Sequence, residues 1–262
     1  MHIQKRIENY WQTANERYDE TIQRELKGVQ KEVWLRLLRE SRPPGEKLEV
    51  LDIGTGPGFF PLLLSEMGHQ VTAIDCTESM LATARENAEG AGFDVSFHLM
   101  DAHKLAFEDN SFDMILTRNV TWLMYDPPAA YREWHRVLKP GGRLLIFDAN
   151  YYLWTQDSQW QEEFERDTEE AVKLGFKKFE ASNVEESNRI GQDLFFSKIR
   201  RPQWDVPVLF NLGFGKIYVE GDLSELISDE ISKVRYRTMP PFMIRAEKTE
   251  VNYLYGLKSQ DF

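Results

Sequence analysis

Paired cysteines are missing from this sequence, in which Cys76 is the only cysteine among 262 residues. A lone thiol excludes an internal disulfide and a zinc or redox site built from paired thiols, and we predict no metal site. The sequence also lacks a run of roughly 20 apolar residues that could span a bilayer, and residues 1–12 contain no apolar segment of a secretory signal. We therefore expect a soluble, cytoplasmic protein without a membrane partner.

Basic residues are outnumbered, because 32 Lys and Arg stand against 43 Asp and Glu and give a formal charge of −11. An acidic surface repels the phosphate backbone that supplies most non-specific affinity for nucleic acids, so we expect no nucleic-acid partner. Hydrophobic residues make up 42% of the chain, which is enough for the core of one large α/β domain or two small ones.

Three closely spaced glycines mark the stretch 50–60, which reads VLDIGTGPGFF. The apolar residues around Asp52 predict the end of a buried parallel strand, and residues 59–64 continue in a helix-compatible pattern. Glycines at 54, 56 and 58 allow a sharp turn in which a ligand lies against bare backbone, facing the first N–H groups of the helix. The pattern is typical of a nucleotide-binding turn.

The spacing of these glycines indicates which nucleotide is bound. A dinucleotide fingerprint requires G-x-G-x-x-G, but the third glycine, Gly58, comes one residue early. No Gly-Lys-Ser/Thr follows, which excludes a P-loop. The pattern Asp-x-Gly-x-Gly-x-Gly resembles motif I of the class I S-adenosylmethionine-dependent methyltransferases, in which the aspartate, here Asp52, answers the cationic methionine end of the cofactor. A glycine-rich turn in another α/β protein is the alternative.

Strand and helix patterns alternate from Leu48 onward, which predicts a parallel sheet with helices on both faces. Asp126 and Pro127 suit the start of a helix, as its N-cap and its first helical residue. The predicted strands are 48–53, 70–75, 94–99, 112–118 and 143–148, and the predicted helices between them are 61–67, 80–89 and 129–138.

Acidic residues stand at the ends of three successive predicted strands. Ligands bind at the carboxyl edge of open α/β sheets, and a carboxylate there can accept hydrogen bonds from both ribose hydroxyls, the role that we predict for Asp75. Asp101, after the third strand, could accept from the adenine amino group. Taken alone it is as well explained by ordinary loop polarity, but its place in the series favours the ligand role.

The resemblance to class I methyltransferases extends from about Val50 to Phe147, through LDIGTGPG, AIDCTESML, MDAHKLAF, FDMILTRN and VLKPGGRLLIF in the family's order. It implies a Rossmann-like, seven-stranded, mostly parallel sheet, with a sixth strand at 216–220 and an antiparallel seventh at 242–246. It also implies S-adenosyl-L-methionine as cofactor. The implied cofactor residues are Asp52, Gly54, Thr55, Gly56, Gly58, Asp75, Cys76, Met80, Asp101, Ala102 and Asn119. Met100 and His103 depart from the family pattern on the adenine side.

Two segments outside the alternating core are rich in aromatic residues. Residues 1–40 read as helical, and 151–202 follow the fifth strand at the ligand-binding edge. We predict one methyltransferase domain over residues 1–262, composed of an N-terminal helical cover (1–47), a cofactor-binding core (48–150), a lid insertion (151–202), and the last crossover helix with strands six and seven (203–262). Ordinary packing of the aromatic rings against the core is the alternative to a cover.

Methyl transfer from a sulfonium is an in-line displacement that requires alignment, exclusion of water and, for some acceptors, removal of a proton. The Asn/Asp-Pro-Pro-Tyr/Phe tetrad of amide and adenine amine methylation is missing after the fourth strand. Histidines 69, 98 and 135 are better explained by structural roles, and no general base is identified. The residues predicted around the acceptor are Tyr18, Arg118, Trp122, Tyr151 and Tyr152.

Three functions are consistent with the sequence. The leading one is methyl transfer to N, O or S of a small soluble metabolite by a monomer or homodimer. The alternatives are a protein or RNA methyltransferase and a non-catalytic S-adenosylmethionine-binding regulator. The acidic charge and the covering segments favour the first, because a macromolecular substrate needs an open approach.

Overall fold

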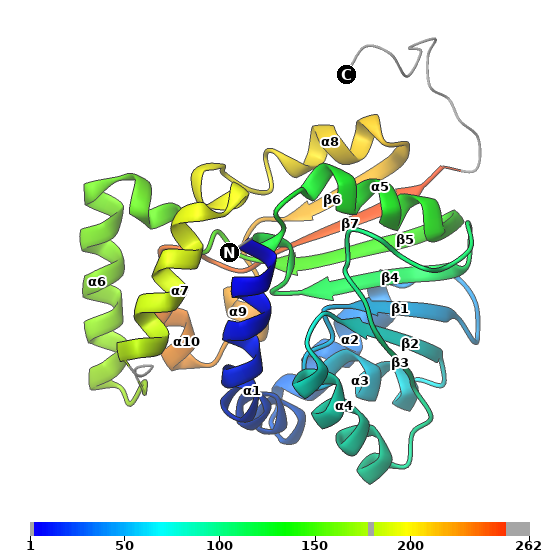
Figure 1. The fold of residues 1–262 in the computed structure, drawn as a ribbon, viewed down its shortest axis with the longest axis horizontal. Coiled ribbons are helices and arrows are strands. Elements are labelled where there is room, and N and C mark those ends of the chain that lie inside the picture. Colours follow the sequence, from blue (N-terminus) through cyan, green and yellow to red (C-terminus); the bar gives the residue numbers. More distant parts are fainter. Residues whose placement is uncertain (1–2, 178–180, 250–262) are drawn as a thin grey trace.

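A seven-stranded mixed sheet forms the centre of the computed structural model, which describes residues 3–177 and 181–249 (Figure 1). The strand order is β3-β2-β1-β4-β5-β7-β6, and β7 is antiparallel to both of its neighbours. This arrangement confirms the predicted fold class, including the inserted seventh strand. The strands are β1 Glu49–Ile53, β2 Gln70–Asp75, β3 Ser96–Leu99, β4 Phe112–Arg118, β5 Leu138–Asp148, β6 Phe214–Glu220 and β7 Phe242–Lys248.

Alternating side chains of the central strands pack on opposite faces of the sheet. In β1, Val50 packs with the buried residues of α2 (Gln30–Ser41) and α3 (Phe59–Glu66), whereas Leu51 packs with those of α5 (Pro127–Val137) and α8 (Asp205–Asn211). Both side chains are fully buried. Apolar residues at every position of a strand are expected where a parallel sheet is covered on both sides. A further helix of the alternating core, α4 (Glu78–Ala91), follows β2.

Asp126 starts α5 as the sequence indicates. Its side chain accepts a hydrogen bond from the backbone N–H of Ala129, and Pro127 occupies the first helical turn. Residues 126–128 therefore begin a helix and do not form a substrate-holding tetrad. β5 starts at Leu138, earlier than the predicted 143, because the stretch after α5 already pairs with β4 at Phe112.

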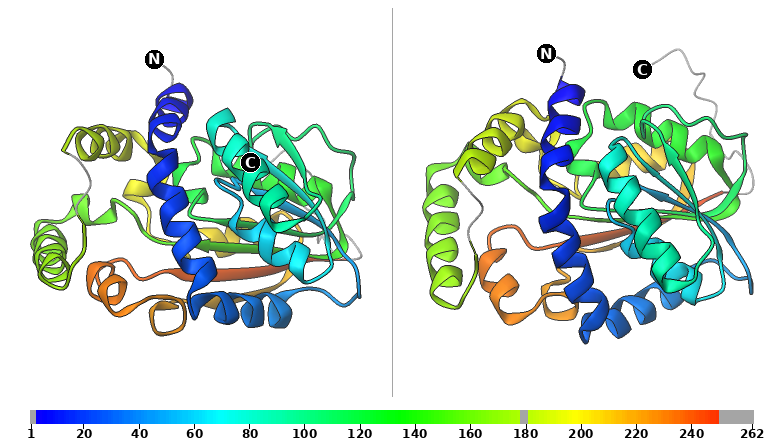
Figure 2. Two further views of the ribbon diagram at one scale, coloured as in Figure 1. Left: turned by 90° about the horizontal axis from the view of Figure 1, so that it is seen from below. Right: turned by 60° about the horizontal axis from the view of Figure 1, so that its bottom comes forward.

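The N-terminal region is two helices, not the single helical run predicted for residues 1–40. α1 (Ile3–Lys27) ends before Gly28, and α2 begins at Gln30. Glycine in a helix interior costs about 1 kcal/mol relative to alanine, which makes this position a natural break. Figure 2 shows α1 crossing the molecule with α4 on one side and α7 (Ala181–Asp193) on the other, and α1 contacts both helices.

The segment after β5 forms short helices stacked beside the sheet. It contains η2 (Leu153–Gln156), α6 (Ser158–Lys173), α7 and η3 (Phe195–Lys198), and two further helices, α9 (Ser224–Ile227) and α10 (Glu230–Arg235), lie between β6 and β7. Helices α6 and α7 lie within the segment 151–202, and α9 and α10 were not predicted. Among the described residues, no helix combines the length and apolarity that a membrane span requires.

Candidate active site

A cavity lies where β1, β2, β3 and β4 end, and α1 covers it. Its empty volume, including space open to solvent, is about 720 Å³. The lining comes from α1, the turn after β1, the ends of β2 and β3, the start of α4, and the end of β4 with the loop after it. The lining residues are Gln4, Ile7, Trp11, Tyr18, Gly54, Gly56, Ile74, Asp75, Cys76, Met80, Met100, Asp101, Ala102, His103, Arg118, Asn119, Val120, Leu123 and Met124.

The glycine turn is fixed against β2 by backbone hydrogen bonds. The N–H groups of Gly54 and Thr55 both donate to the carbonyl oxygen of Ile74, at 2.8 and 2.9 Å. Gly54 and Gly56 have φ angles of +69° and +53°, which residues other than glycine rarely adopt. A Cβ atom on Gly54 would lie 2.4 Å from Cγ2 of Val120. Glycine at 54 therefore lets the loop after β4 approach the turn.

Asp52 and Thr55 lie beside a second, smaller cavity of about 270 Å³, which shares Tyr18, Gly54 and Arg118 with the first. Burial raises the pKa of Asp52 to about 7; the charge of nearby Asp75 adds to this shift, and the charge of Arg118 opposes it. A buried carboxylate with this pKa is well placed to receive a cation.

Gly58 lines neither cavity. It precedes α3 with a φ of +95°, and a Cβ atom there would lie 3.3 Å from Cβ of Ala84. Because Gly58 has no side chain, the turn can adopt this φ angle and α3 can pack closely against α4. The structure thus gives Gly58 a packing role within the predicted cofactor motif.

Asp75 lies at the end of β2 and lines the main cavity. Its Oδ2 accepts from the backbone N–H of Gly56 and its Oδ1 from that of Thr77, both at 2.9 Å. Burial raises its pKa to about 6, although these two N–H groups oppose the shift. Each carboxylate oxygen can accept a further hydrogen bond, so Asp75 can hold the turn and a ligand hydroxyl together.

Asp101 is held by two aromatic neighbours. His103 Nδ1 lies 2.7 Å from its Oδ1, and the hydroxyl of Tyr125 donates to its Oδ2 at 2.9 Å. Burial works to raise the pKa of Asp101, but these hydrogen bonds outweigh it and bring the pKa to about 2. The rings of His103 and Tyr125 stack with their centroids 3.7 Å apart. Tyr125 was missed in the sequence, since nothing in its local pattern places it beside Asp101.

The remaining predicted cofactor residues, Cys76, Met80, Ala102 and Asn119, all line the main cavity. Burial raises the pKa of the Cys76 thiol to about 12, with the charge of Asp75 as the next cause. Cys76 therefore stays protonated and offers a small apolar surface. Asn119 has a φ of +57°, a left-handed conformation that asparagine tolerates better than most residues.

Among the predicted acceptor residues, Tyr18 and Arg118 line both cavities. Arg118 Nη2 lies 2.7 Å from Oε2 of Glu25 on α1, and its guanidinium carbon lies 4.4 Å from the ring centroid of Phe59. Arg118 thus already has an acidic partner on the covering helix.

Trp122, Tyr151 and Tyr152 do not line the cavity. Trp122 Nε1 donates to the carbonyl oxygen of Asn119 at 2.9 Å, and the hydroxyl of Tyr151 donates to Oδ1 of Asn119 at 3.0 Å. Tyr152 is hydrogen-bonded instead to Ser187 of α7. The structure places Trp122 and Tyr151 behind Asn119, and Tyr152 against the inserted helices.

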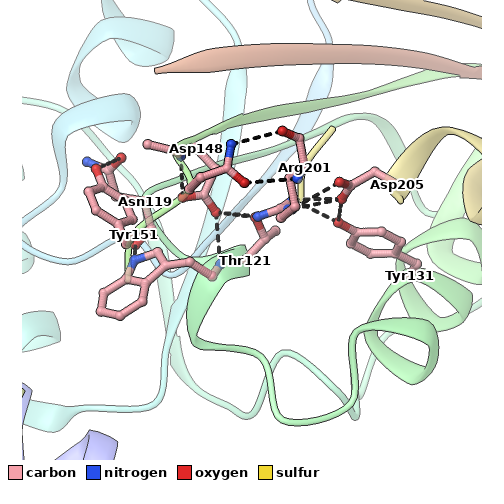
Figure 3. A network of polar contacts seen from close by, with 10 residues as sticks. Asn119, Thr121, Tyr131, Asp148, Tyr151, Arg201 and Asp205 are labelled. Carbon is pink, nitrogen blue, oxygen red and sulfur yellow. Dashed lines mark hydrogen bonds and ion pairs between the residues drawn. The ribbon is translucent and has the colours of Figure 1, made fainter. Parts of the chain in front are cut away.

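A fully buried charged network lies behind the loop after β4 (Figure 3). Arg201 pairs with Asp148 at the end of β5 (3.0 Å) and with Asp205 of α8 (2.7 Å). Asp148 also accepts hydrogen bonds from the hydroxyl of Thr121 and, at 2.9 Å, from the backbone N–H of Trp122. The network thereby fixes the loop that carries Asn119. Sequence reading missed it, because an isolated Arg or Asp carries no sign of burial.

Sequence reading also missed several apolar lining residues. Ile7 and Trp11 come from α1, where only the aromatic character of the segment gave a signal, and Leu123 and Met124 come from the loop after β4. The polar residue Gln4 of α1 was missed as well. In the described ranges, no three His, Cys, Asp or Glu side chains gather as a metal site.

Comparison with known proteins gives this geometry a context. A family model described as a methyltransferase domain matches residues 51–146. The chain is 38% identical over 106 residues to phosphoethanolamine N-methyltransferase 3 of Arabidopsis thaliana, covering 40% of this chain and 21% of that protein. It is 39% identical over 118 residues to malonyl-[acyl-carrier protein] O-methyltransferase of Erwinia pyrifoliae, covering 45% of this chain and 43% of that protein. The chain spans less than half the length of these curated relatives.

Solved structures extend the likeness beyond the matched segment. Phosphoethanolamine N-methyltransferase 2 of Haemonchus contortus, in complex with phosphomonomethylethanolamine and S-adenosylhomocysteine, gives a TM-score of 0.58 at 22% identity, covering 82% of this chain and 52% of that chain. A proposed S-adenosylmethionine-dependent methyltransferase of Methanococcus maripaludis also gives 0.58, at 20% identity, covering 93% of this chain and 95% of that one. At such identities the likeness shows a shared fold.

Proposed function

We propose that the protein is a class I, S-adenosylmethionine-dependent methyltransferase that transfers a methyl group to N, O or S of a small soluble metabolite. The match of residues 51–146 to a methyltransferase domain supports this proposal. One observation carries the proposal. The glycine turn, Asp75 and Asp101 line one cavity at the sheet's carboxyl edge, under α1.

The lining fits the proposed cofactor part by part. Bare backbone at Gly54 and Gly56 borders the cavity, which suits the close approach of a ligand. Asp75 has acceptor capacity for the ribose hydroxyls, and Asp101 for the adenine amino group. Asp52, in the adjoining cavity, is a buried acid that suits the cationic methionine end. When bound, S-adenosylmethionine supplies an electrophilic methyl group for in-line displacement.

The residues of this chain contribute alignment and exclusion of water. Ile7, Trp11, Leu123 and Met124 give the cavity an apolar wall on the side of α1 and the loop after β4. Burial raises the pKa of Tyr18, so its hydroxyl stays protonated at neutral pH and acts as a hydrogen-bond donor. We propose that Tyr18 and Asn119 orient the acceptor, while Trp122 and Tyr151 position Asn119.

A small acceptor suits the cover and the charge of the chain. Helix α1 lies over the cavity, and a protein or RNA would need an open approach to it. The formal charge of −11 disfavours RNA further. The relatives named above methylate different acceptors, so they support methyl transfer without naming the compound. We propose a cytoplasmic monomer or homodimer.

A labelling experiment tests the proposal. Purified protein is incubated with S-adenosylmethionine carrying a labelled methyl group and a metabolite extract, and label is sought in the small-molecule, protein and RNA fractions. We expect label in one small compound. The matched inactive control is Gly56→Val, which puts a branched side chain at a φ of +53° with Cβ 3.3 Å from Tyr18. Label in protein or RNA alone supports the second function, and cofactor binding without any transfer supports a regulator.

A further inference from the structure

The carboxylate of Asp101 has most of its acceptor capacity taken by donors of the protein. Its Oδ1 accepts from the backbone N–H of His103 at 2.9 Å and lies 2.7 Å from Nδ1 of the same residue. Its Oδ2 accepts from the hydroxyl of Tyr125 at 2.9 Å. Because each carboxylate oxygen has two lone pairs, Oδ1 is fully used and Oδ2 can accept one more hydrogen bond. The side chain of Asp101 is 37% exposed and lines the cavity, so a ligand there can reach it.

The His103 ring is held in one orientation and one tautomer. Its Nε2 accepts from the backbone N–H of Asp126 at 3.4 Å, so the ring hydrogen lies on Nδ1 and is donated to Asp101. The side chain of His103 is only 8% exposed, and its ring stacks on that of Tyr125. The two donors to Asp101 therefore support each other, although they come from the loops after two different strands.

Tyr125 acts on the cavity only through Asp101, because it does not line the cavity itself. Burial, and next the hydrogen bond to Asp101, raise the pKa of Tyr125 to about 12, so its hydroxyl stays protonated and donates. Without this hydroxyl the carboxylate would be held through Oδ1 alone and would turn more freely about its Cβ–Cγ bond. Tyr125 thus sets the direction in which the last lone pair of Oδ2 is offered.

The sheet places Asp101 next to the acid proposed for the ribose. Leu99 of β3 pairs in register with Asp75 of β2, and the N–H of Met100 donates to the carbonyl oxygen of Asp75 at 2.9 Å. Asp101 follows directly, one strand further along the same edge. A base joined to a ribose at Asp75 is therefore expected within reach of Asp101.

We propose that Tyr125, together with His103, is a positioning residue that makes the cofactor site specific for a 6-aminopurine. The inference rests on the proposed function and deepens its cofactor site. A 6-amino group donates to the open lone pair of Oδ2, whereas the oxygen of a 6-oxopurine in the same place is repelled by the carboxylate. Hydrogen bonds weaken steeply when they are misaligned, so this discrimination depends on how the carboxylate is held.

A comparison of two ligands that differ at this group tests the assignment. The full chain is titrated calorimetrically with S-adenosylhomocysteine and, separately, with S-inosylhomocysteine, in which an oxygen replaces the 6-amino group. We expect the wild type to bind the first at least about tenfold more tightly, and Tyr125→Phe to lower this ratio at least about threefold. The variant keeps the stacked ring and loses only the hydroxyl. The matched control is Tyr218→Phe, which removes a hydroxyl from an exposed tyrosine of β6 and should leave the ratio unchanged.

The ratio separates positioning from a purely structural role, which would weaken the binding of both ligands by the same factor. Such an equal loss, or a ratio that is unchanged or raised in Tyr125→Phe, overturns the inference. Thermal melting checks the fold of the variant. Should it fail to fold, His103→Phe takes its place, since it keeps a ring against Tyr125, removes the Nδ1 donor and should lower the ratio as well. A wild type that binds both ligands equally rejects the inference and keeps the proposed function, whereas a wild type that binds neither contradicts both.

Discussion

The hydroxyl of Tyr151 donates a 3.0 Å hydrogen bond to Oδ1 of Asn119. The bond joins the segment leaving β5 to the loop leaving β4, so two strand ends are tied together at the wall of the cavity. Asn119 holds a left-handed backbone conformation there, with a φ of +57°. A residue in that conformation needs support from its surroundings, and Tyr151 and Trp122 both provide it.

Removing the hydroxyl of Tyr151 should slow methyl transfer without weakening the binding of the cofactor. We expect Tyr151→Phe to lower kcat by roughly 10-fold, because the lost hydrogen bond is worth about 0.5–1.5 kcal/mol and Asn119 would lose its orientation. Affinity for S-adenosylhomocysteine should stay within about threefold, since Tyr151 does not line the cavity. Steady-state kinetics and calorimetry measure the two quantities. Unchanged kcat would remove Tyr151 from the positioning of Asn119.

Asp75→Ala should weaken cofactor binding. The carboxylate has capacity for ligand hydroxyls and also holds Gly56, so we expect a loss of about 1.5–3 kcal/mol, the range for hydrogen bonds to charged groups. Calorimetry with S-adenosylhomocysteine gives the value. The control Asp94→Ala removes the same charge from an exposed position and should leave affinity unchanged. Equal affinities in the two variants would place the ribose elsewhere.

Cofactor affinity should rise with pH up to about 7. In the ligand-free protein burial raises the pKa of Asp52 to about 7 and that of Asp75 to about 6, so both carboxyls hold a proton at mildly acidic pH. A cationic ligand favours the ionised form of Asp52, and binding therefore releases a proton below pH 7. Affinity should increase by at most about tenfold per pH unit between pH 6 and 7, where Asp52 alone titrates, more steeply below pH 6, where Asp75 also titrates, and then level off above pH 7.

Asp52→Asn provides the control for this pH dependence. The variant should lose the part of the profile near pH 7 and keep the part near pH 6 that belongs to Asp75. Calorimetry in two buffers with different heats of ionisation counts the released protons. The same pKa values imply that the ligand-free protein becomes less stable as pH rises between the unfolded value, near 4, and about 7, because the unfolded chain gives up these protons first. A flat affinity profile would contradict the placement of the cation beside Asp52.

Arg201→Met should destabilise the fold strongly. The substitution leaves Asp148 and Asp205 buried without their cation, and breaking a buried pair in this way costs about 3–5 kcal/mol. The adjacent Arg200→Met is the matched control. Arg200 is exposed and lies 5.2 Å from the ring of Trp160, so its loss should cost less than about 1 kcal/mol. Urea unfolding compares the two variants, and similar midpoints would mean that the network contributes no net stability.

The cover should become ordered when ligands bind. Helix α1 lines the cavity and contacts α7, so we expect backbone amides of α1 and of the described part of 151–202 to exchange more slowly with cofactor and acceptor present. Hydrogen exchange followed by mass spectrometry measures this, and the amides of β4 and β5 serve as the internal reference. Equal hydrogen exchange with and without ligands would mean that α1 and the described part of 151–202 only pack against the core and do not act as a cover.

The core of the fold could be predicted from local patterns. The apolar runs gave β2 and β4 their observed bounds, and the Asp126-Pro127 pair gave the start of α5. These features depend on neighbouring residues alone. The acids at the strand ends were found for the same reason, since a parallel sheet brings the carboxyl ends of its strands to one edge.

Contacts between distant segments could not be predicted in this way. Tyr125 meets Asp101 across 24 positions, and Arg201 meets Asp148 across 53. No spacing rule connects such residues, and the sequence does not show whether an arginine is buried or exposed. The segment 151–202 was noticed for its aromatic residues, but Tyr151 and Tyr152 do not line the cavity, and the direction of each ring depends on backbone turns such as the φ of +67° at Tyr152.

Helix α1 precedes every strand along the chain, yet several of its hydrogen-bond and ion-pair partners come much later in the sequence. Asn15 bonds Thr83, 68 positions on, and Arg6 bonds Glu186 and Asp193, 180 and 187 positions on. During synthesis, therefore, the first five strands leave the ribosome before Glu186 and Asp193, the partners of Arg6 at the start of α1, have been made. Until Glu186 and Asp193 are made, Arg6 lacks both of these acidic partners, so this end of α1 cannot yet be held over the cavity by them.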